Sequence, residues 1–278
     1  MNLRLKTARA GHIHLFGLGF IIVVVAVAFI QSSTPPRLVG ISSFLTRPTN
    51  PYSPAVIDAV LDKMAATHLT LYRMVIWSTD DPVPPAQYYL SHSNYELIVC
   101  RSTGDAVVYT TAEWNAARVW SLTLLSSLAS YQSRLWIEPV SKVLNLDFVP
   151  RIQTLIAAIR VAGYTSRIIV NKYDHPWDTM QVLDDPLHEF YTGCSYNFAH
   201  DDIHLVQDEM QTVLDMRMKI FNTDLSAKSN GTIQAADVVQ LNEFLAWCVP
   251  RKIGGTVVMG EGVEYWEAYH DAGLHLPL

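Results

Sequence analysis

The sequence predicts an α/β protein built as a (β/α)8 TIM barrel. Short runs rich in β-branched and aromatic residues alternate with longer segments in which apolar residues recur three and four positions apart. Strands that alternate with helices pair in parallel, because parallel neighbours need a crossover connection and helices usually supply it. Eight such units fit into about 240 residues, close to the ~250 residues typical of a closed barrel.

The eight expected strands share a β-rich composition and end at polar residues or turns. Closure of the barrel requires the first and last strands to pair, which would put Val39 and Val257 on neighbouring strands. The expected strands are Arg37–Ser42, Leu69–Trp77, Tyr95–Ser102, Arg134–Val140, Ser166–Tyr173, Tyr191–Phe198, Lys219–Leu225 and Gly254–Glu261.

Five helices are expected from apolar periodicity. A capping box at Thr110 to Glu113 predicts that one of them begins at Thr111. An open doubly wound sheet is the alternative architecture, but no GxGxxG or Walker glycine pattern follows the first strand. The expected helices are Pro54–Thr67, Thr111–Gln132, Phe148–Ala162, Ile203–Met216 and Ala235–Trp247.

The composition excludes one class of function. Of the 278 residues, 50% are hydrophobic and 17% are charged, so the chain can bury a large core. The net charge of −6 is mild, and Lys and Arg are scattered along the chain. A nucleic-acid binder would gather them into a basic stripe, so we expect no nucleic-acid partner.

The N-terminal segment predicts export. Residues 1–36 form a signal-anchor or signal peptide with a linker, ahead of a barrel domain over residues 37–278. Three basic residues precede the uncharged apolar run Leu15–Ile30, which is slightly short of the ~20 residues of a membrane-spanning helix. The basic flank favours a cytoplasmic N-terminus, so the barrel is expected to be extracytoplasmic, either anchored in the membrane or secreted. Small residues near the end of the run leave cleavage open, whereas Phe29 suits an uncleaved anchor.

Neither the cysteines nor the loop Ser226–Asp237 predicts a metal site. Cys100, Cys194 and Cys248 are too few and too far apart for a zinc site or a disulfide framework. Buried free thiols are expected, although export would permit one bridge. The loop Ser226–Asp237 has part of the spacing of a calcium loop, but Lys228 stands at the third ligand position. It is interpreted as a turn followed by a helix, and no metal or cofactor is predicted.

Polar residues stand where the strands are expected to end, and chemistry in such barrels gathers at these ends. Pro139 ends the fourth strand and would present Glu138 at the barrel mouth. Burial beside Trp136 favours the protonated form that a proton donor needs. A buried ion pair of Glu138 with Arg73 or Arg101 is the alternative, and Asp224 could equally form an Asx turn or a helix cap.

The motifs at these strand ends resemble clan A glycoside hydrolases, especially the cellulase-like family 5. The carrying segments are "LTLYRMVIWS", "LWIEPV", "SYNFAHDD" and "IFNTDLS". The resemblance implies that Glu138 is the general acid/base and that Asp224 stands at the nucleophile position, with Arg73 beside it. It implies a β-linked polysaccharide or glycan as substrate. The substrate-binding candidates are Arg73, Trp77, Tyr196, His200 and Glu261.

Two residues depart from the family pattern. Ile137 replaces the Asn that precedes the acid/base, and Asp224 replaces a Glu, which draws its carboxylate back by ~1.5 Å. Retaining glycosidases hold their carboxyls ~5–5.5 Å apart and inverting ones ~6.5–9.5 Å apart, so the shorter side chain moves the pair toward inversion or removes the covalent step. A catalytically impaired carbohydrate-binding TIM barrel is therefore the alternative function.

We predict one membrane passage with the barrel outside the cytoplasm, because the basic flank precedes the apolar run and no second long apolar segment follows it. Protease added to intact spheroplasts should digest the barrel. Protection that disappears only after lysis would contradict this topology.

Overall fold

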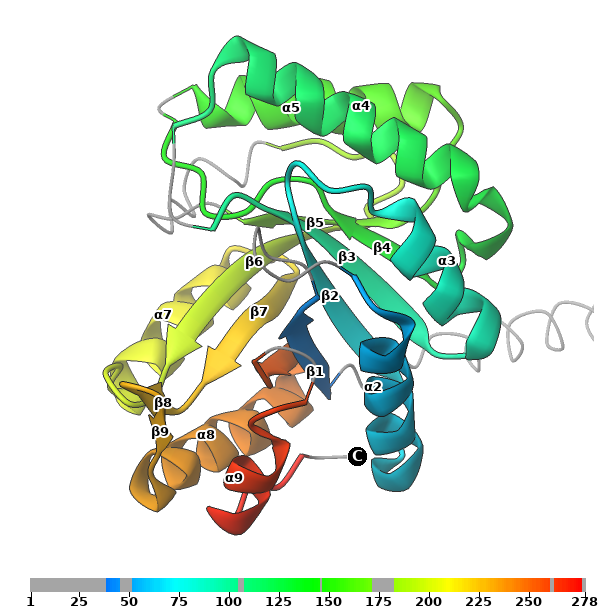
Figure 1. The fold of residues 1–278 in the computed structure, drawn as a ribbon. Coiled ribbons are helices and arrows are strands. Elements are labelled where there is room, and N and C mark those ends of the chain that lie inside the picture. Colours follow the sequence, from blue (N-terminus) through cyan, green and yellow to red (C-terminus); the bar gives the residue numbers. More distant parts are fainter. Residues whose placement is uncertain are drawn as a thin grey trace, which may run out of the picture. The chain divides into compact units, whose positions relative to one another are not determined.

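The barrel domain is a closed barrel of eight parallel strands in the order β1-β10-β7-β6-β5-β4-β3-β2 (Figure 1). The computed structural model describes residues 39–45, 52–104, 108–145, 147–171, 183–260 and 263–276. All eight expected strands are confirmed, and the open sheet is excluded. The barrel strands are β1 Val39–Phe44, β2 Leu71–Trp77, β3 Glu96–Ser102, β4 Leu135–Glu138, β5 Arg167–Asn171, β6 Phe190–Asn197, β7 Ile220–Ser226 and β10 Gly254–Val258.

The first and last barrel strands pair as predicted. Ile41 of β1 lies opposite Val257 of β10, and Val39 lies opposite Gly255. On its other side β1 pairs with β2, and the two backbones approach closely at Gly40. A Cβ at Gly40 would lie 2.2 Å from the carbonyl oxygen of Leu71, so this seam of the barrel requires glycine.

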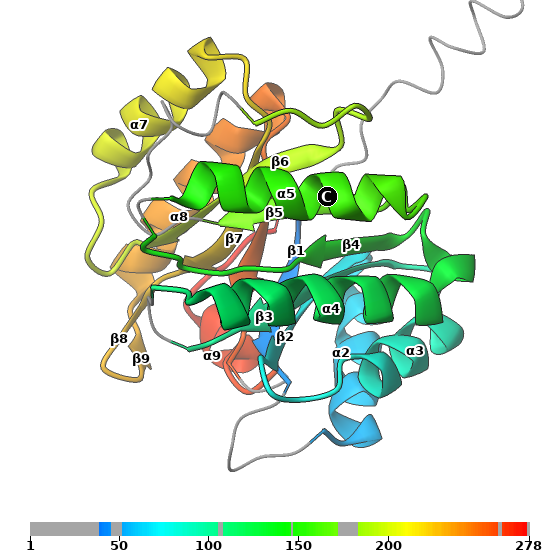
Figure 2. The same ribbon diagram turned by 90° about the horizontal axis from the view of Figure 1, so that it is seen from above.

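Helices surround the strands (Figures 1 and 2), and α4 and α5 lie side by side in both views. All five predicted helices are confirmed, with the one that begins at Thr111 ending in the short 3-10 turn Ala129–Tyr131. The helices are α2 Pro54–Thr67, α3 Val83–His92, α4 Thr111–Ser127, α5 Phe148–Val161, α7 Ile203–Asp215, α8 Ala235–Cys248 and α9 Trp266–Asp271.

Two helices, α3 and α9, were not expected from the sequence. The first turn of α3 contains prolines, which are tolerated there because the first N–H groups of a helix have no intrahelical acceptor. Helix α9 has six residues, too few to establish a period.

Three further features predicted from the sequence are present: the capping box, the buried free cysteines and the turn before α8. Thr110 Oγ1 accepts from the N–H of Glu113 at 3.3 Å, and Glu113 Oε2 accepts from the N–H of Thr110 at 2.5 Å, so the capping box is formed. The three cysteines are buried and free, as predicted. The loop after β7 is a small hairpin, β8 Lys228–Ser229 and β9 Thr232–Ile233, that leads into α8. It is a turn before a helix, as interpreted.

The N-terminal segment, including the apolar run Leu15–Ile30, lies outside the described residues, so the boundary between segment and barrel stays a prediction. None of the helices in the described part of the chain is long and apolar enough to cross a membrane.

An apolar layer fills the lower barrel interior, near the amino ends of the strands. The indole ring of Trp136 lies 5.5 Å from the ring of Phe221, centroid to centroid, and its N–H donates to Glu96 Oε2 at 2.7 Å. Because side chains alternate across a strand, the next inward positions toward the carboxyl ends form a second layer above this one. The apolar layer comprises Leu71, Ile98, Trp136, Ile169 and Phe221.

A buried ion pair fixes the segment that leads into β6. Arg160 of α5 donates to both carboxylate oxygens of Asp185, each at 2.8 Å, and the Asp185 side chain has no exposed surface. Burial alone would raise the pKa of Asp185, but hydrogen bonds from Arg160 and from the backbone of Leu187 and Glu189 outweigh burial and lower it.

Asp185→Asn should lower the free energy of unfolding at pH 7 by about 3–5 kcal/mol, because it leaves the charge of Arg160 buried and unpaired. The folded pKa is lowered, so this stabilisation is complete above the pKa of unfolded Asp, ~3.9, and is lost as pH falls through the folded value. Urea unfolding of wild type and variant at several pH values measures the difference. Asp147→Asn removes a partly exposed ion pair with Arg151 and should cost less than about 1 kcal/mol. Equal losses in the two variants would contradict the assignment.

Candidate functional site

Polar side chains form the second layer of the barrel interior, above the apolar one. Several of them lie two positions after an apolar inward residue on the same strand, as Arg73 does after Leu71 and Glu138 after Trp136. The alternation of strand side chains therefore brings them to one level near the carboxyl ends of the strands.

Arg73 and Glu138 form a two-pronged ion pair in this layer. Arg73 Nε donates to Glu138 Oε2 at 2.7 Å, and Nη2 donates to Oε1 at 3.0 Å. The side chains are 1% and 0% exposed, respectively. Paired hydrogen bonds between a guanidinium and a carboxylate are among the stronger side-chain contacts. The alternative noted from the sequence, a buried ion pair of Glu138 with Arg73, is what the structure contains.

The same guanidinium holds Asp224. Arg73 Nη1 donates to Asp224 Oδ1 at 2.8 Å and to Ser42 Oγ at 3.0 Å. The Asp224 side chain is 19% exposed, so it is the carboxylate of the pair that reaches the surface. Ser195 Oγ donates to its other oxygen at 3.4 Å. The structure therefore brings together Arg73, Glu138 and Asp224, as the resemblance implied.

The charges in this group reinforce one another. Burial alone would lower the pKa of Arg73, but the facing Asp224, Cys100 and Glu138 raise it well above its ordinary value. Cys100 Sγ lies 3.2 Å from Arg73 Nη2, and burial raises the pKa of this thiol, so it stays protonated. Arg73 is thus a permanent cation between two carboxylates and a neutral thiol.

A β-bulge in β7 sets where Asp224 points. Cys194 of β6 lies opposite Asn222 and Ser195 lies opposite Asp224, so Thr223 is the extra residue. Its hydroxyl accepts from Asn171 Nδ2 at 3.0 Å, while Asp224 also contacts interior residues. A bulge changes the direction of side chains locally, which explains how two consecutive residues of β7, Thr223 and Asp224, both contact the barrel interior.

Three polar members of the layer, Cys100, Ser195 and Thr223, were not predicted as part of the site. Cys100 lies two residues after inward-facing Ile98, and this period was a usable signal. Thr223 likewise lies two residues after inward-facing Phe221, whereas the inward contact of Asp224 depends on the bulge that interrupts this period.

Trp77 and His200 stand near the carboxyl ends of their strands. Trp77 is the last residue of β2, and its ring lies close to Gly104, where a Cβ would come within 2.7 Å of Cη2. His200 is exposed in the turn after β6. Their roles in substrate binding stay predictions. Glu261 lies outside the described residues.

Tyr196 does not join this group. Ser195 faces the interior, so Tyr196 faces the helices by the alternation of the strand. Its hydroxyl donates to Glu209 Oε2 of α7 at 3.0 Å, and its ring packs against Phe244 of α8. The structure therefore places Tyr196 against the helices, away from Glu138 and Asp224, and not at the predicted position near the sugar.

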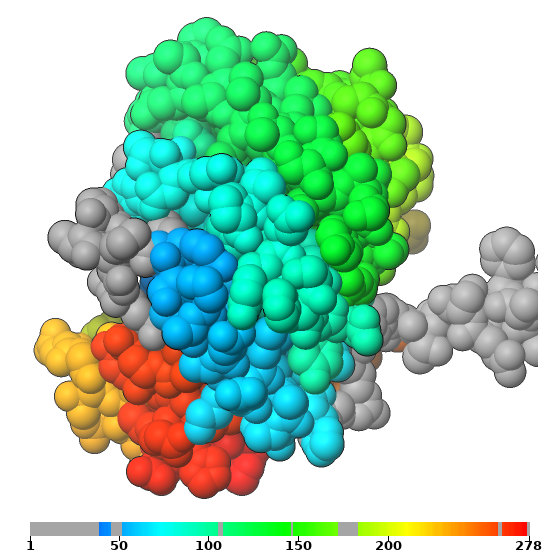
Figure 3. Space-filling model, turned by 45° about the vertical axis from the view of Figure 1, so that its right-hand side comes forward, coloured from blue at the N-terminus to red at the C-terminus, as the bar shows by residue number. Residues whose placement is uncertain are grey.

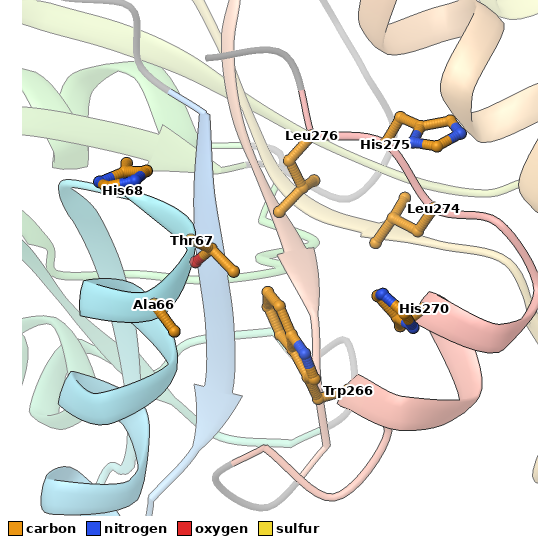
Figure 4. Close-up of a pocket in the computed structure, with 8 residues that line it drawn as sticks. All are labelled: Ala66, Thr67, His68, Trp266, His270, Leu274, His275 and Leu276. Atoms are coloured by element: carbon orange, nitrogen blue, oxygen red, sulfur yellow. The ribbon is translucent and has the colours of Figure 1, made fainter.

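Two cavities lie elsewhere in the barrel domain. One of about 210 Å³ adjoins Trp136 and Arg167 at the amino ends of the strands. The other, about 340 Å³, lies on the outer wall, where α2 and the segment of α9 are neighbours (Figure 3) and Lys63 pairs with Glu267. Figure 4 shows the indole of Trp266 at its centre. This outer pocket is lined by Ala66, Thr67, His68, Trp266, His270, Leu274, His275 and Leu276. Within the described residues, no three His, Cys, Asp or Glu side chains are arranged to hold a metal ion.

Arg73→Met should lower the free energy of unfolding by about 3–5 kcal/mol, because it leaves the buried charge of Glu138 unpaired. Arg167→Met is the matched control: Arg167 also pairs with two carboxylates, Glu96 and Glu189, but its side chain is 28% exposed. We expect the control to cost about 1 kcal/mol or less. Chemical denaturation of both variants measures the difference, and a control as unstable as Arg73→Met would contradict the prediction.

Comparison with solved structures gives the fold. The barrel is similar to a beta-mannanase from Thermomonospora fusca, with a TM-score of 0.63 and 13% identity over 82% of this chain and 81% of that one. It is similar to an endo-beta-1,4-glucanase from Xanthomonas axonopodis pv. citri, with a TM-score of 0.64 and 13% identity over 84% and 91% of the chains. A GH5 cellulase from an Icelandic hot spring isolate gives a TM-score of 0.63 and 14% identity over 82% and 76%.

Comparison at the level of sequence finds no relative of this chain. No family model and no curated protein matches the chain. The structural similarity, at these identities, concerns the course of the backbone. The chain has the (β/α)8 barrel fold of family 5 cellulases and mannanases, as its strand-end motifs implied.

Proposed function

We propose that this chain is a glycoside hydrolase that acts on a β-linked polysaccharide or glycan. One observation carries the proposal: Glu138 and Asp224, from motifs far apart in the sequence, meet at the guanidinium of Arg73 near the carboxyl ends of the barrel strands. Paired carboxylates are the working groups of most glycosidases. The fold alone would not suffice, since barrels of this kind support many reactions.

The exposure of the two carboxylates suggests their roles. Asp224 reaches the surface and is held by Arg73 and Ser195, which suits a nucleophile or the base that activates a water. Glu138 is the proton donor. Both of its oxygens accept from Arg73 in this structure, so donation to a glycosidic oxygen requires one of these hydrogen bonds to open and the freed oxygen to take up a proton before it is passed on. Catalytic hydrogen bonds often reach their working geometry only in the substrate complex.

The solved relatives support the substrate class. Those of similar fold are a mannanase, a glucanase and a cellulase, and one structure is the mannohexaose complex of the Thermomonospora fusca mannanase. By this similarity we assign a carbohydrate substrate to the present chain. The basic flank and apolar run of the N-terminal segment support an extracytoplasmic place of action, with that segment as the contact to the membrane.

A carbohydrate-binding barrel without catalysis is the second candidate, and one observation favours it. The side chain of Glu138 has no exposed surface, and Arg73 occupies both of its oxygens. A carboxylate that stays in this ion pair stabilises the barrel and does not reach a substrate. A screen of β-linked glycans with the purified full chain separates the candidates: binding with cleavage supports the hydrolase, and binding without cleavage supports the binder.

On a glycan that the chain cleaves, Glu138→Gln should lower turnover by about 10² to 10⁴, because the amide keeps the shape but cannot deliver a proton. Glycan binding should survive. Glu96→Gln is the matched control, because Glu96 is also ion-paired but lies at the other end of the barrel, beside Arg167. Its turnover should be unchanged. A Glu138→Gln variant as active as wild type would exclude Glu138 as the proton donor.

Changing the length of the second carboxylate separates two mechanisms. If Asp224 activates a water for inversion, Asp224→Glu should lower activity, because the longer side chain takes the water's place. If Asp224 is a retracted nucleophile, the same variant should raise activity by restoring the longer reach. Steady-state turnover and the anomer of the product, followed by NMR, decide between them. Full activity in Asp224→Asn would contradict both.

A further inference from the structure

A second chain of contacts links the two carboxylates without passing through Arg73. Asn171 Nδ2 of β5 lies 3.5 Å from Glu138 Oε1 and 3.0 Å from Thr223 Oγ1. Thr223 Oγ1 lies 3.2 Å from Ser195 Oγ, which in turn donates to Asp224 Oδ2 at 3.4 Å. With Arg73, these contacts close a ring of polar side chains across the barrel interior.

The donors in this chain of contacts show that it holds atoms in place and does not carry protons. The single hydroxyl hydrogen of Thr223 is given to the carbonyl oxygen of Cys194 at 2.9 Å. Thr223 Oγ1 is therefore the acceptor toward Asn171, and it can accept from Ser195 only when the single hydroxyl hydrogen of Ser195 is not given to Asp224. The amide of Asn171 donates in both of its contacts and has no proton to pass on at ordinary pH. No proton can move from Glu138 to Asp224 along this path.

We propose that Asn171 is a positioning residue that fixes the carboxylate of Glu138 relative to that of Asp224. The inference rests on the proposed function for its kinetic consequence, but its geometric content stands alone. Asn171 is 3% exposed, and its one amide nitrogen contacts both Glu138 and the bulge residue beside Asp224. When a Glu138–Arg73 hydrogen bond opens for catalysis, the Asn171 amide remains to hold Glu138 Oε1 in the interior.

The groups that face Glu138 come from three neighbouring elements. Arg73 of β2 pairs with it, the protonated thiol of Cys100 of β3 adjoins it, and Asn171 of β5 completes the set. Asp224 faces it across the guanidinium of Arg73. Asn171 is neutral, so replacing it with alanine changes the position of Glu138 without removing a charge.

The kinetic test uses the full chain on a glycan that it cleaves. Asn171→Ala should lower kcat about 10²-fold, the cost of a displacement of about 1 Å at a reacting group, and leave KM nearly unchanged. Asn171→Asp places a second carboxylate beside Glu138. Like charges disfavour ionisation, so the basic limb of the pH–rate profile, which reports the proton donor, should move to higher pH.

Asn222→Ala is the matched control. Asn222 is a buried amide on β7 that points to the helices, where its nitrogen faces Cys248 Sγ at 3.9 Å. Any loss of stability from a buried amide should appear in both alanine variants, whereas the loss of kcat should appear only at Asn171. Equal kcat losses in the two variants, or an unmoved pH profile in Asn171→Asp, would overturn the proposal.

A structural readout keeps this inference separate from the proposed function. If the wild-type chain cleaves no glycan, the hydrolase fails, and crystal structures of wild type and Asn171→Ala then decide the role of Asn171. A changed separation between the carboxylates of Glu138 and Asp224 supports positioning. An unchanged separation overturns it.

Discussion

The guanidinium of Arg73 is the contact on which the upper half of the barrel interior depends. It donates to Glu138, Asp224, Ser42 and Cys100, which come from four other strands. A buried cation with this many partners is costly to remove from water, and only the full set of acceptors offsets that cost. The strands that supply these partners must therefore keep their register, so the ion pairs specify the relative positions of β1, β2, β3, β4 and β7.

The same contact connects stability with chemistry. The guanidinium that stabilises the buried Glu138 also occupies the two oxygens that a proton donor would use. Asp224 shares the guanidinium but keeps part of its surface exposed. A single cation thus treats its two carboxylates differently, and the difference comes from the bulge in β7 that places Asp224 at the edge of the layer.

Beneath this layer, the apolar side chains close the barrel toward the amino ends of the strands. Trp136 packs against Phe221 and Tyr191, and its other surroundings are polar: Arg167 lies over its ring and Glu96 accepts from its N–H. The interior is therefore apolar below and charged above. The buried apolar layer beneath the charges lowers the polarity of their surroundings, which strengthens the ion pairs above it.

The sequence by itself determined the elements and the order of the barrel, because these depend on local periodicity. The eight strands, the five amphipathic helices, the capping box at Thr110 and the buried thiols all follow from residues near one another in the chain. The strand-end position of Glu138 and Asp224 could also be predicted, since the carboxyl ends of parallel strands share one edge.

Only the tertiary structure decided how these side chains pair. The two hydrogen bonds from Arg73 to Glu138 depend on strands that are distant in sequence. The outward direction of Tyr196 depends on the phase of β6, and the inward contact of Asp224 depends on a bulge that local periodicity does not encode. A slip of one residue reverses the face of every side chain on a strand, so phase and bulges are set by the neighbouring strands.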